Sequence, residues 1–334
     1  MTNNVLEVRD LKVHFLQEEG PPVRAVDGMS YSVKRGECTA IIGESGSGKT
    51  VSALSILRLI PFPPGLIAGG EILFDGKDIL KASDEEIRKI RGARISMIFQ
   101  EPSAALNPVM TVGKQLEEAI LLHTDQTRQQ AHEHAIELLK MVDIPNAEER
   151  INQYPFQFSG GMQQRVMIAM AMCCEPEVLI ADEPTTALDV TVQAQVLEQL
   201  NHLRKQTGVA LIIITHNLGV VAHYAESVKI MYGGKIVEQG STKDVFKNPH
   251  HPYTAGLIKA VPRLDRPISE ELYTIEGEPP DMRFVPENSC AFAPRCQYAT
   301  EQCRTMRPVS QQVGAEHFVS CFPRDQVAQG GEFQ

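Results

Sequence analysis

The chain has 334 residues, of which 43% are hydrophobic and 22% are charged, a composition typical of a globular protein rather than of a disordered or collagen-like chain. It carries 32 Lys and Arg residues against 42 Asp and Glu residues, and the net charge of −10 argues against a nucleic-acid binder that relies on a broad basic surface. At roughly 100–200 residues per domain, the length allows more than one domain.

The sequence shows neither a secretory signal nor a membrane-spanning segment. Residues 1–10 lack the basic start and apolar stretch of a secretory signal, and no apolar run approaches the roughly 18–20 residues needed to cross a bilayer. We therefore expect the chain to stay in the cytosol and to reach a membrane through a partner. In that reducing compartment, clustered cysteines are candidates first for metal or cluster ligands.

The first part of the chain predicts short strands around a glycine-rich turn. Apolar and polar residues alternate at residues 4–14, 25–33 and 71–74, which predicts antiparallel strands. Residues 37–42 form an apolar strand pattern that enters the turn, and residues 51–59 repeat apolar residues at helical spacing.

The middle of the chain predicts a helical insert followed by alternating strands and helices. Residues 84–91 and 114–142 show helical patterns, the second with an apolar stripe. Further along, the predicted elements are a helix from Gly161 toward Cys174, a strand at 178–181, a helix at 191–205 and strands at 210–215 and 228–232. This alternation predicts a mostly parallel sheet with helices on both faces.

The composition changes after Gly240. Residues 246–334 are rich in proline and hold four of the seven cysteines, with little helical periodicity beyond residues 254–260. We expect a nucleotide-binding region at 1–245, with a helical subdomain at about 89–165, and a small C-terminal domain at 246–334 whose order depends on more than a hydrophobic core.

The glycine-rich turn fits the phosphate-loop pattern G-x-x-x-x-G-K-[ST] between a strand and a helix. Its residues are Gly43, Glu44, Ser45, Gly46, Ser47, Gly48, Lys49 and Thr50. Glycines let the backbone N–H groups turn inward around phosphate oxygens. We expect Lys49 to reach the β- and γ-phosphates of a nucleotide and the Thr50 hydroxyl to bind Mg²⁺.

Two carboxylates end the apolar strand at 178–181. In a phosphate-binding α/β protein, Asp182 is the candidate partner of Mg²⁺, and Glu183 is placed to polarise an attacking water as general base. Alone, the sequence Asp-Glu-Pro would only end a strand, but together with the phosphate loop it indicates hydrolysis.

A second glycine-containing helix start follows Phe158. Ser159 is a capping residue there, and the N–H groups of Gly160 and Gly161 offer a second anion site. On this motif the chain resembles the ATP-binding subunits of ABC transporters, whose signature reads Leu-Ser-Gly-Gly-Gln. The sequence departs from that signature at Phe158 and Met162 and keeps its Ser-Gly-Gly core.

The resemblance extends to four further positions. It implies that Phe15 stacks on adenine, that Gln100 is the Q-loop glutamine sensing Mg²⁺ and γ-phosphate, and that His216 is the switch histidine. Asp189, in Ala187-Leu188-Asp189, matches the loop that crosses the dimer interface. The implied fold is the ABC cassette of the P-loop NTPases: a RecA-like α/β core with an antiparallel β subdomain and an α-helical subdomain, followed here by the small cysteine-containing C-terminal domain.

Three shorter stretches of the sequence resemble the oligopeptide/dipeptide importer subfamily, which also includes nickel and other solute importers. These stretches are residues 101–108, residues 185–191 and His251-Pro252-Tyr253-Thr254. The resemblance implies an ATP-hydrolysing importer subunit for di- and oligopeptides, peripheral on the cytoplasmic face of the inner membrane. Its implied partners are a homologous ATPase in a heterodimer, two transmembrane permease subunits and an extracytoplasmic solute-binding protein, with no nucleic acid. The alternatives are a nickel or other solute importer, a soluble ABC ATPase acting on the ribosome or DNA, and a regulatory cassette without turnover.

Four cysteines in the proline-rich region are spaced C-x5-C-x6-C-x17-C: Cys290, Cys296, Cys303 and Cys321. Four thiolates can bind a tetrahedral zinc or an iron–sulfur cluster. The first two spacings are wide for the C-x2–4-C pairs of structural zinc sites, and the resembled subfamily includes members with a four-iron cluster. We therefore expect a [4Fe-4S] cluster in a structural or redox-sensing role beside ATP and Mg²⁺. The alternatives are Zn²⁺ and, after it, four unrelated buried thiols.

Overall fold

The structure is a computed structural model that describes residues 3–186, 189–262 and 273–322. The chain divides into two compact units. Unit 1 comprises Met1–Glu7, Ser32–Cys38 and Ile72–Ile214, and unit 2 comprises Val8–Tyr31, Thr39–Glu71 and Thr215–Gln334. Among the described residues, no helix has the length and apolar character needed to span a membrane.

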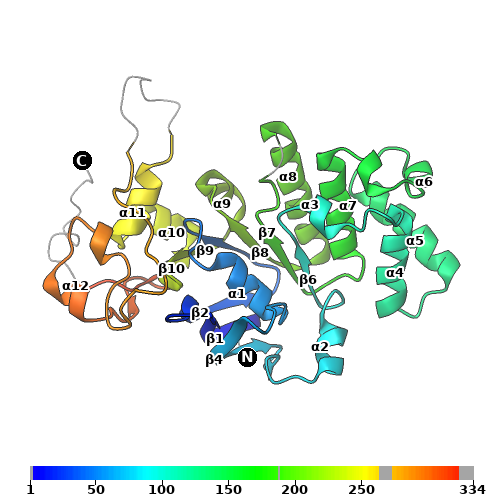
Figure 1. The fold of residues 1–334 in the computed structure, drawn as a ribbon. Helices are drawn as coiled ribbons and strands as arrows, with labels where there is room; N and C mark the ends of the chain where they lie inside the picture. Colours follow the sequence, from blue (N-terminus) through cyan, green and yellow to red (C-terminus); the bar gives the residue numbers. More distant parts are fainter. Residues whose placement is uncertain (1–2, 187–188, 263–272, 323–334) are drawn as a thin grey trace. The chain divides into compact units, whose positions relative to one another are not determined.

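The first strands form a four-stranded sheet in the order β2-β1-β4-β5 (Figure 1). Buried residues recur at alternate positions over residues 11–14 of β1 and 29–34 of β2, as the predicted antiparallel strands require, whereas adjacent residues are buried at 5–6 and 25–26. The bounds are Asn4–Phe15 for β1, Val23–Lys34 for β2, Gly65–Phe74 for β4 and Lys77–Asp78 for β5.

Unit 1 contains three parallel strands, β6 (Ile95–Ile98), β7 (Val178–Asp182) and β8 (Ala210–Thr215), with β7 in the middle. Every residue of the three strands is buried, which explains why they read as continuous apolar runs rather than as alternating patterns. Their carboxyl ends lie at one edge, where Asp182 ends β7.

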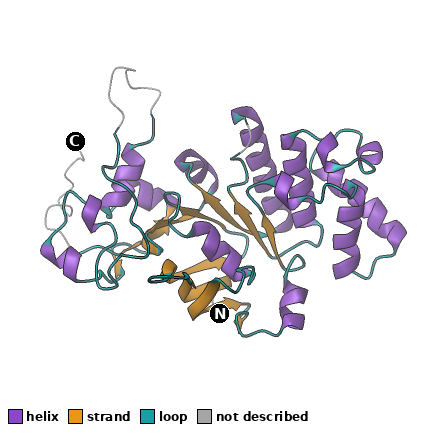
Figure 2. Cartoon of the chain, viewed as in Figure 1, coloured by secondary structure: helices purple, strands orange, loops and turns teal. Residues whose placement is uncertain are grey.

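Every helix is purple in Figure 2, and the helices at the right of that view belong to unit 1 (Figures 1 and 2). The region predicted as helical at 114–142 consists of two helices, because Thr127 begins a new one with a capping box that Gln130 completes. The bounds are α2 Asp84–Ile90, α3 Pro102–Ala105, α4 Val112–His123, α5 Arg128–Met141, α6 Ala147–Arg150, α7 Gly160–Met172 and α8 Val190–Thr207.

Unit 2 contains the strand that leads into the phosphate loop, β3 (Cys38–Ile42), which pairs in parallel with β9 (Ser227–Tyr232). Beyond β9 the order continues β10-β12-β11 with antiparallel pairing. The remaining bounds are β10 Lys235–Ser241, β11 Gln311–Gln312, β12 Phe318–Val319, α1 Lys49–Ile56, α9 Leu218–Tyr224, α10 Thr242–Lys247, α11 Pro252–Lys259 and α12 Glu301–Thr305.

The C-terminal segment, defined as residues 273–322, therefore supplies strands to the sheet that carries the phosphate loop. In the pairing of β12 with β10, Val319 lies opposite Glu238, and the Ser320 N–H donates to the Val237 carbonyl at 2.8 Å. The sequence predicted neither β10 nor the two-residue strands β11 and β12.

A buried carboxylate fastens this segment to β10. Glu238 accepts hydrogen bonds from the backbone N–H groups of His250 and His251 at 2.7 and 2.9 Å, and lies 2.7 Å from Nε2 of His317, next to β12. Burial alone would raise the pKa of Glu238, but the hydrogen bonds from His317 and the two N–H groups outweigh it and lower that pKa.

Glu238→Gln removes this charge without changing the size of the side chain. We expect a loss of about 1–3 kcal/mol in the free energy of unfolding at pH 7, because a hydrogen bond to a buried charged group is replaced by a neutral one. Since the pKa of Glu238 is lowered on folding, the stabilisation is complete above about pH 4.3, the ordinary pKa of glutamate, and is lost as the pH falls through the folded pKa.

Urea unfolding of the wild type and the variant at pH 7 and at about pH 3 measures this difference, which is expected to shrink at the lower pH. The exposed Glu301 on α12 provides the matched control variant Glu301→Gln. Equal stability of all three proteins at pH 7 contradicts the assignment.

Candidate functional site

The phosphate loop joins β3 to α1 through two close backbone approaches. At Gly48 the backbone is left-handed, with φ of 98°, and a Cβ there would lie 2.1 Å from the carbonyl oxygen of Ala25. A Cβ at Gly43 would lie 2.1 Å from the carbonyl oxygen of Met231, on β9. Side chains at these positions would push the loop away from its supports, so the pattern of glycines is a steric requirement.

The loop encloses a buried ammonium group. Nζ of Lys49 donates hydrogen bonds to the carbonyl oxygens of Gly43 and Glu44 at 2.8 and 2.9 Å. The buried Oγ of Ser47 has no hydrogen-bond partner among the described residues. A buried cation, an unsatisfied hydroxyl and the first turn of α1 together favour an anion such as a nucleotide phosphate.

The structure adds two residues to this loop that the sequence did not single out as site residues. The N–H of Glu44 donates to the hydroxyl of Tyr253 at 2.9 Å, and Oε2 of Glu44 lies 2.7 Å from Nη1 of Arg295. Tyr253 belongs to the motif His251–Thr254, noted in the sequence only as a mark of subfamily, and Arg295 directly precedes Cys296.

The carboxylates that end β7 lie in unit 1. Asp182 is buried at the end of the strand, and Glu183 has a left-handed backbone with φ of 45°, which is strained for any residue except glycine. Oε2 of Glu183 accepts hydrogen bonds from Nε2 of Gln100 at 3.2 Å and from Oγ1 of Thr186 at 2.8 Å. The predicted Gln100 and Glu183 are thus in contact, and Thr186 is an additional partner that the sequence did not indicate.

Two helix starts in unit 1 carry the other predicted residues. Ser159 caps α7 by accepting a hydrogen bond from the N–H of Met162. Gly160 is exposed, with no atom within 4 Å of the position of a Cβ, whereas a Cβ on Gly161 would lie 2.9 Å from Val192.

Asp189 caps α8 by accepting hydrogen bonds from the N–H groups of Thr191 and Val192 at 3.1 and 3.0 Å. The preceding residues of the same motif, 187 and 188, lie outside the described residues.

Phe15 and His216 both belong to unit 2. Phe15 ends β1 half-buried, with its ring 3.2 Å from the position of a Cβ on Gly65. His216 directly follows β8 and is exposed. The predicted site residues therefore fall into two groups: the phosphate loop, Phe15 and His216 in unit 2, and Gln100, Asp182, Glu183, Asp189 and residues 159–161 in unit 1.

The four cysteines of the C-terminal segment converge without forming a metal site. Cys290, Cys296, Cys303 and Cys321 line one cavity together with His251 and Phe292, but its volume is only about 10 Å³, the space of about one water. In the part of the chain that the structure describes, no three His, Cys, Asp or Glu side chains are placed to hold a metal ion. Within its described residues, the structure therefore gives no support to the expected [4Fe-4S] cluster or to its zinc alternative. The expectation rested on cysteine spacing, which does not fix where the thiols lie.

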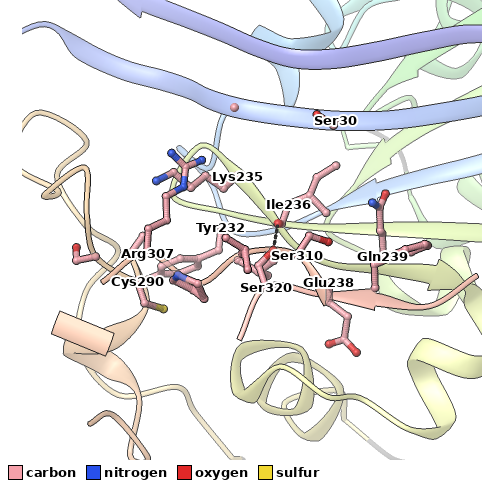
Figure 3. Close-up of a pocket in the computed structure, with 17 residues that line it drawn as sticks. Ser30, Tyr232, Lys235, Ile236, Glu238, Gln239, Cys290, Arg307, Ser310 and Ser320 are labelled. Carbon is pink, nitrogen blue, oxygen red and sulfur yellow. Dashed lines mark hydrogen bonds between the residues drawn. The ribbon is translucent and has the colours of Figure 1, made fainter. Parts of the chain in front are cut away.

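A larger cavity of about 360 Å³ lies between the β10 region and the C-terminal segment, within unit 2 (Figure 3). Tyr232, Lys235 and Glu238 line it from the strands, and Arg307 and Ser320 from the segment. Of the predicted site residues, only Cys290 borders this cavity.

Comparisons with known proteins identify the two parts of the chain. The ABC transporter family model matches residues 26–186, and the model of the oligopeptide/dipeptide transporter C-terminal region matches residues 237–303. Among curated relatives, the dipeptide transport ATP-binding protein DppD of Bacillus subtilis is 49% identical over 97% of this chain and 96% of its own length. The oligopeptide transport ATP-binding protein OppD of the same organism is 48% identical over 94% of this chain and 87% of its own length.

Solved structures support the same assignment. A dimeric ATP-binding cassette, MJ0796, in a post-hydrolysis state bound to ADP and phosphate, matches with a TM-score of 0.63 and 27% identity, covering 71% of this chain and 98% of its own. The cassette CbiO1 of Clostridium perfringens matches with a TM-score of 0.61 and 28% identity, over 76% of this chain and 95% of its own. The predicted ABC cassette fold is confirmed, and the chain belongs to the ATP-hydrolysing, ATP-binding proteins of the ABC transporter family.

Proposed function

We propose that this chain is the ATPase subunit of an importer of dipeptides or oligopeptides. The observation that carries the proposal is the match of residues 237–303 to the C-terminal region of oligopeptide/dipeptide transporters, because the cassette alone is common to ABC transporters of every substrate. The relatives named for dipeptide and oligopeptide transport, similar over nearly the whole chain, support it.

Residues 43–50 would hold the phosphates of ATP. The Lys49 ammonium, now bonded to two loop carbonyls, would turn to the more strongly charged β- and γ-phosphate oxygens. Phe15 would stack on the adenine ring. Thr50 and Asp182, with Gln100, would hold Mg²⁺, which neutralises phosphate charge when bound.

Glu183 would act as the general base that takes a proton from the attacking water. Its contacts with Gln100 and Thr186 would hold the carboxylate in one orientation. The strained backbone of Glu183 also supports a functional role, because such strain is concentrated at functional sites. His216 would contact the γ-phosphate, so that Gln100 and His216 report whether the nucleotide is intact.

Residues 159–161 and Asp189 would face the nucleotide bound by a second subunit, which is why the proposed active form is a dimer with a homologous ATPase. The match to a cassette solved as a dimer with ADP and phosphate supports this part. Two membrane permeases, contacted through the helical subdomain at about 89–165, and an external binding protein would complete the importer, with this chain peripheral on the cytoplasmic face of the inner membrane.

Within the chain, we place the cassette at 1–245 and the C-terminal domain at 246–334. The [4Fe-4S] cluster and the zinc ion form no part of the proposed function, because no three His, Cys, Asp or Glu side chains among the described residues are placed to hold a metal ion.

Glu183→Gln tests the proposed base. In the transporter assembled with its permeases, we expect ATP affinity to be kept and ATP turnover to fall by about 10²–10⁴-fold, the usual contribution of a general base. Glu175→Gln is the matched control, because Glu175 is also a non-glycine residue with a left-handed backbone, φ 50°, and is exposed. Turnover of Glu183→Gln within about tenfold of wild type would reject the assignment.

Gly48→Ala tests the phosphate loop. The left-handed backbone costs an alanine about 1–2 kcal/mol, and the approach of 2.1 Å to the Ala25 carbonyl forces the loop to move. Titration with a fluorescent ATP analogue and Mg²⁺ should therefore show a dissociation constant raised by more than about tenfold, since each 1.4 kcal/mol is a factor of ten.

Gly160→Ala is the control for this titration, because Gly160 has open space around it and is proposed to contact only the nucleotide of the partner subunit. The isolated chain with this substitution should bind ATP like the wild type. Unchanged binding by Gly48→Ala would argue against residues 43–50 as the nucleotide site.

A further inference from the structure

Every polar group of Glu44, the second residue of the phosphate loop, has a partner. Its N–H donates to Tyr253, its carbonyl accepts from Nζ of Lys49 and from the N–H of Ser47, and its carboxylate pairs with Arg295. Lys49 and Ser47 belong to the loop itself. Tyr253 and Arg295 lie 209 and 251 residues further along the chain. Through Glu44 the loop is therefore bonded to α11, which contains Tyr253, and to the C-terminal segment, which contains Arg295.

Arg295 reaches Glu44 from a fixed position. Its Nε donates to the carbonyl oxygen of Glu276 at 2.9 Å, its Nη2 to that of Ile275 at 3.2 Å, and its Nη1 also lies 3.3 Å from the hydroxyl of Tyr232. The side chains of Arg295 and Glu44 are only 7% and 23% exposed. A shielded guanidinium that already donates to three other oxygen atoms loses little freedom on pairing, so this pair holds more firmly than an exposed one.

Tyr253 is equally fixed. It is fully buried in α11, where its ring centroid lies 4.6 Å from that of Tyr232 and 5.4 Å from that of Phe292. Packing on these two rings fixes the Tyr253 hydroxyl where it accepts the N–H of Glu44.

These contacts matter most when the nucleotide binds. In the proposed function, Lys49 turns from the carbonyl oxygens of Gly43 and Glu44 to the phosphates. The loop then loses these two hydrogen bonds at the moment when its N–H groups must keep their orientation. Tyr253 and Arg295 are not phosphate ligands and would keep their hold on residue 44 throughout.

We propose that Tyr253 and Arg295 are positioning residues for ATP binding: they hold the peptide between Gly43 and Glu44 in the orientation that accepts phosphate. The inference rests on the proposed nucleotide site at residues 43–50. It also gives Tyr253, in the motif His251–Thr254, a role that the proposed function leaves open.

Tyr253→Phe removes only the hydroxyl, and Arg295→Met keeps an unbranched side chain without the charge. In the full chain, titrated with a fluorescent ATP analogue and Mg²⁺, we expect the dissociation constant to rise about 3- to 10-fold for Tyr253→Phe and about tenfold for Arg295→Met, the effects of losing a neutral and a charged hydrogen bond. In the assembled transporter, KM for ATP should rise by similar factors while kcat at saturating ATP stays within about twofold, since neither residue contacts the reacting atoms.

Arg283→Met is the matched control. Arg283 forms an ion pair at 2.6 Å with Asp281 in the same C-terminal segment, but both side chains are exposed, at 46% and 43%, and neither has a described contact with the loop. This variant should bind ATP like the wild type.

A double-mutant cycle separates positioning from general stability. If Arg295 acts through Glu44, Arg295→Met should change the dissociation constant by less than about 1.5-fold when Glu44→Ala is already present, because coupled residues are not additive. The midpoint temperature of thermal unfolding and the number of ATP sites per chain are measured alongside, and both report any loss of folded protein. A purely structural role would lower those two quantities and leave the affinity of the remaining sites unchanged.

Wild-type affinity of Tyr253→Phe, or additive effects of Arg295→Met and Glu44→Ala, overturns the inference. If Arg295→Met does not fold, the ATP affinity of Tyr253→Phe alone tests the inference. Failure of the wild type itself to bind the ATP analogue would overturn the proposed function instead, so the two failures are distinguishable.

Discussion

A buried ammonium group needs acceptors, and the phosphate loop is built around that need. Removing the charge of Lys49 from water is costly unless oxygen atoms surround it, and the loop supplies the carbonyl oxygens of Gly43 and Glu44. The backbone reaches this arrangement only by approaching the carbonyl oxygens of Met231 and Ala25, where Gly43 and Gly48 leave no room for a side chain. The position of the loop consequently depends on β9 and on the segments that keep β9 and β10 in place.

Those segments include the C-terminal part of unit 2. Strand β12 extends the sheet next to β10, and the buried contact between Glu238 and His317 fixes it there. Phe292, which lies between Cys290 and Cys296 in the sequence, packs on Tyr232 and Tyr253. A region matched to oligopeptide/dipeptide transporters thus makes direct contact with a loop that belongs to the general cassette. This gives that region a physical route to influence ATP binding.

Strands 38–42, 178–182 and 210–215 were predictable nearly to the residue, because each is a continuous buried run bounded by glycine or charge. Strands β11 and β12 have two residues each and show no periodicity. The division of the predicted helical region at Thr127 follows from a capping box, a local signal that the apolar stripe concealed. The catalytic candidates could be named from the sequence because their motifs are also local, and their roles stay predictions.

The contacts of Tyr253 and Arg295 with Glu44 were not predictable, because partners more than 200 residues apart leave no pattern in sequence. The metal site expected at the four cysteines was not supported, for a different reason. Their spacing limits how far apart the four thiols can lie, and they do line a common cavity. Side-chain direction and the packing of Phe292 and His251 decide whether that cavity admits a metal, and spacing contains neither.

In the inferred arrangement, Tyr253 and Arg295 hold the phosphate loop through Glu44, the first at its backbone N–H and the second at its carboxylate. Residue-resolved hydrogen exchange of the Glu44 amide tests it most directly, because that N–H is bonded to Tyr253 and must open before it exchanges. We expect the Glu44 amide to exchange slowly in the wild type and about tenfold faster in Tyr253→Phe, because the substitution removes about 1.4 kcal/mol of protection. Exchange of the amides of α4 should be the same in both proteins. Equal exchange of the Glu44 amide in the two proteins would contradict it.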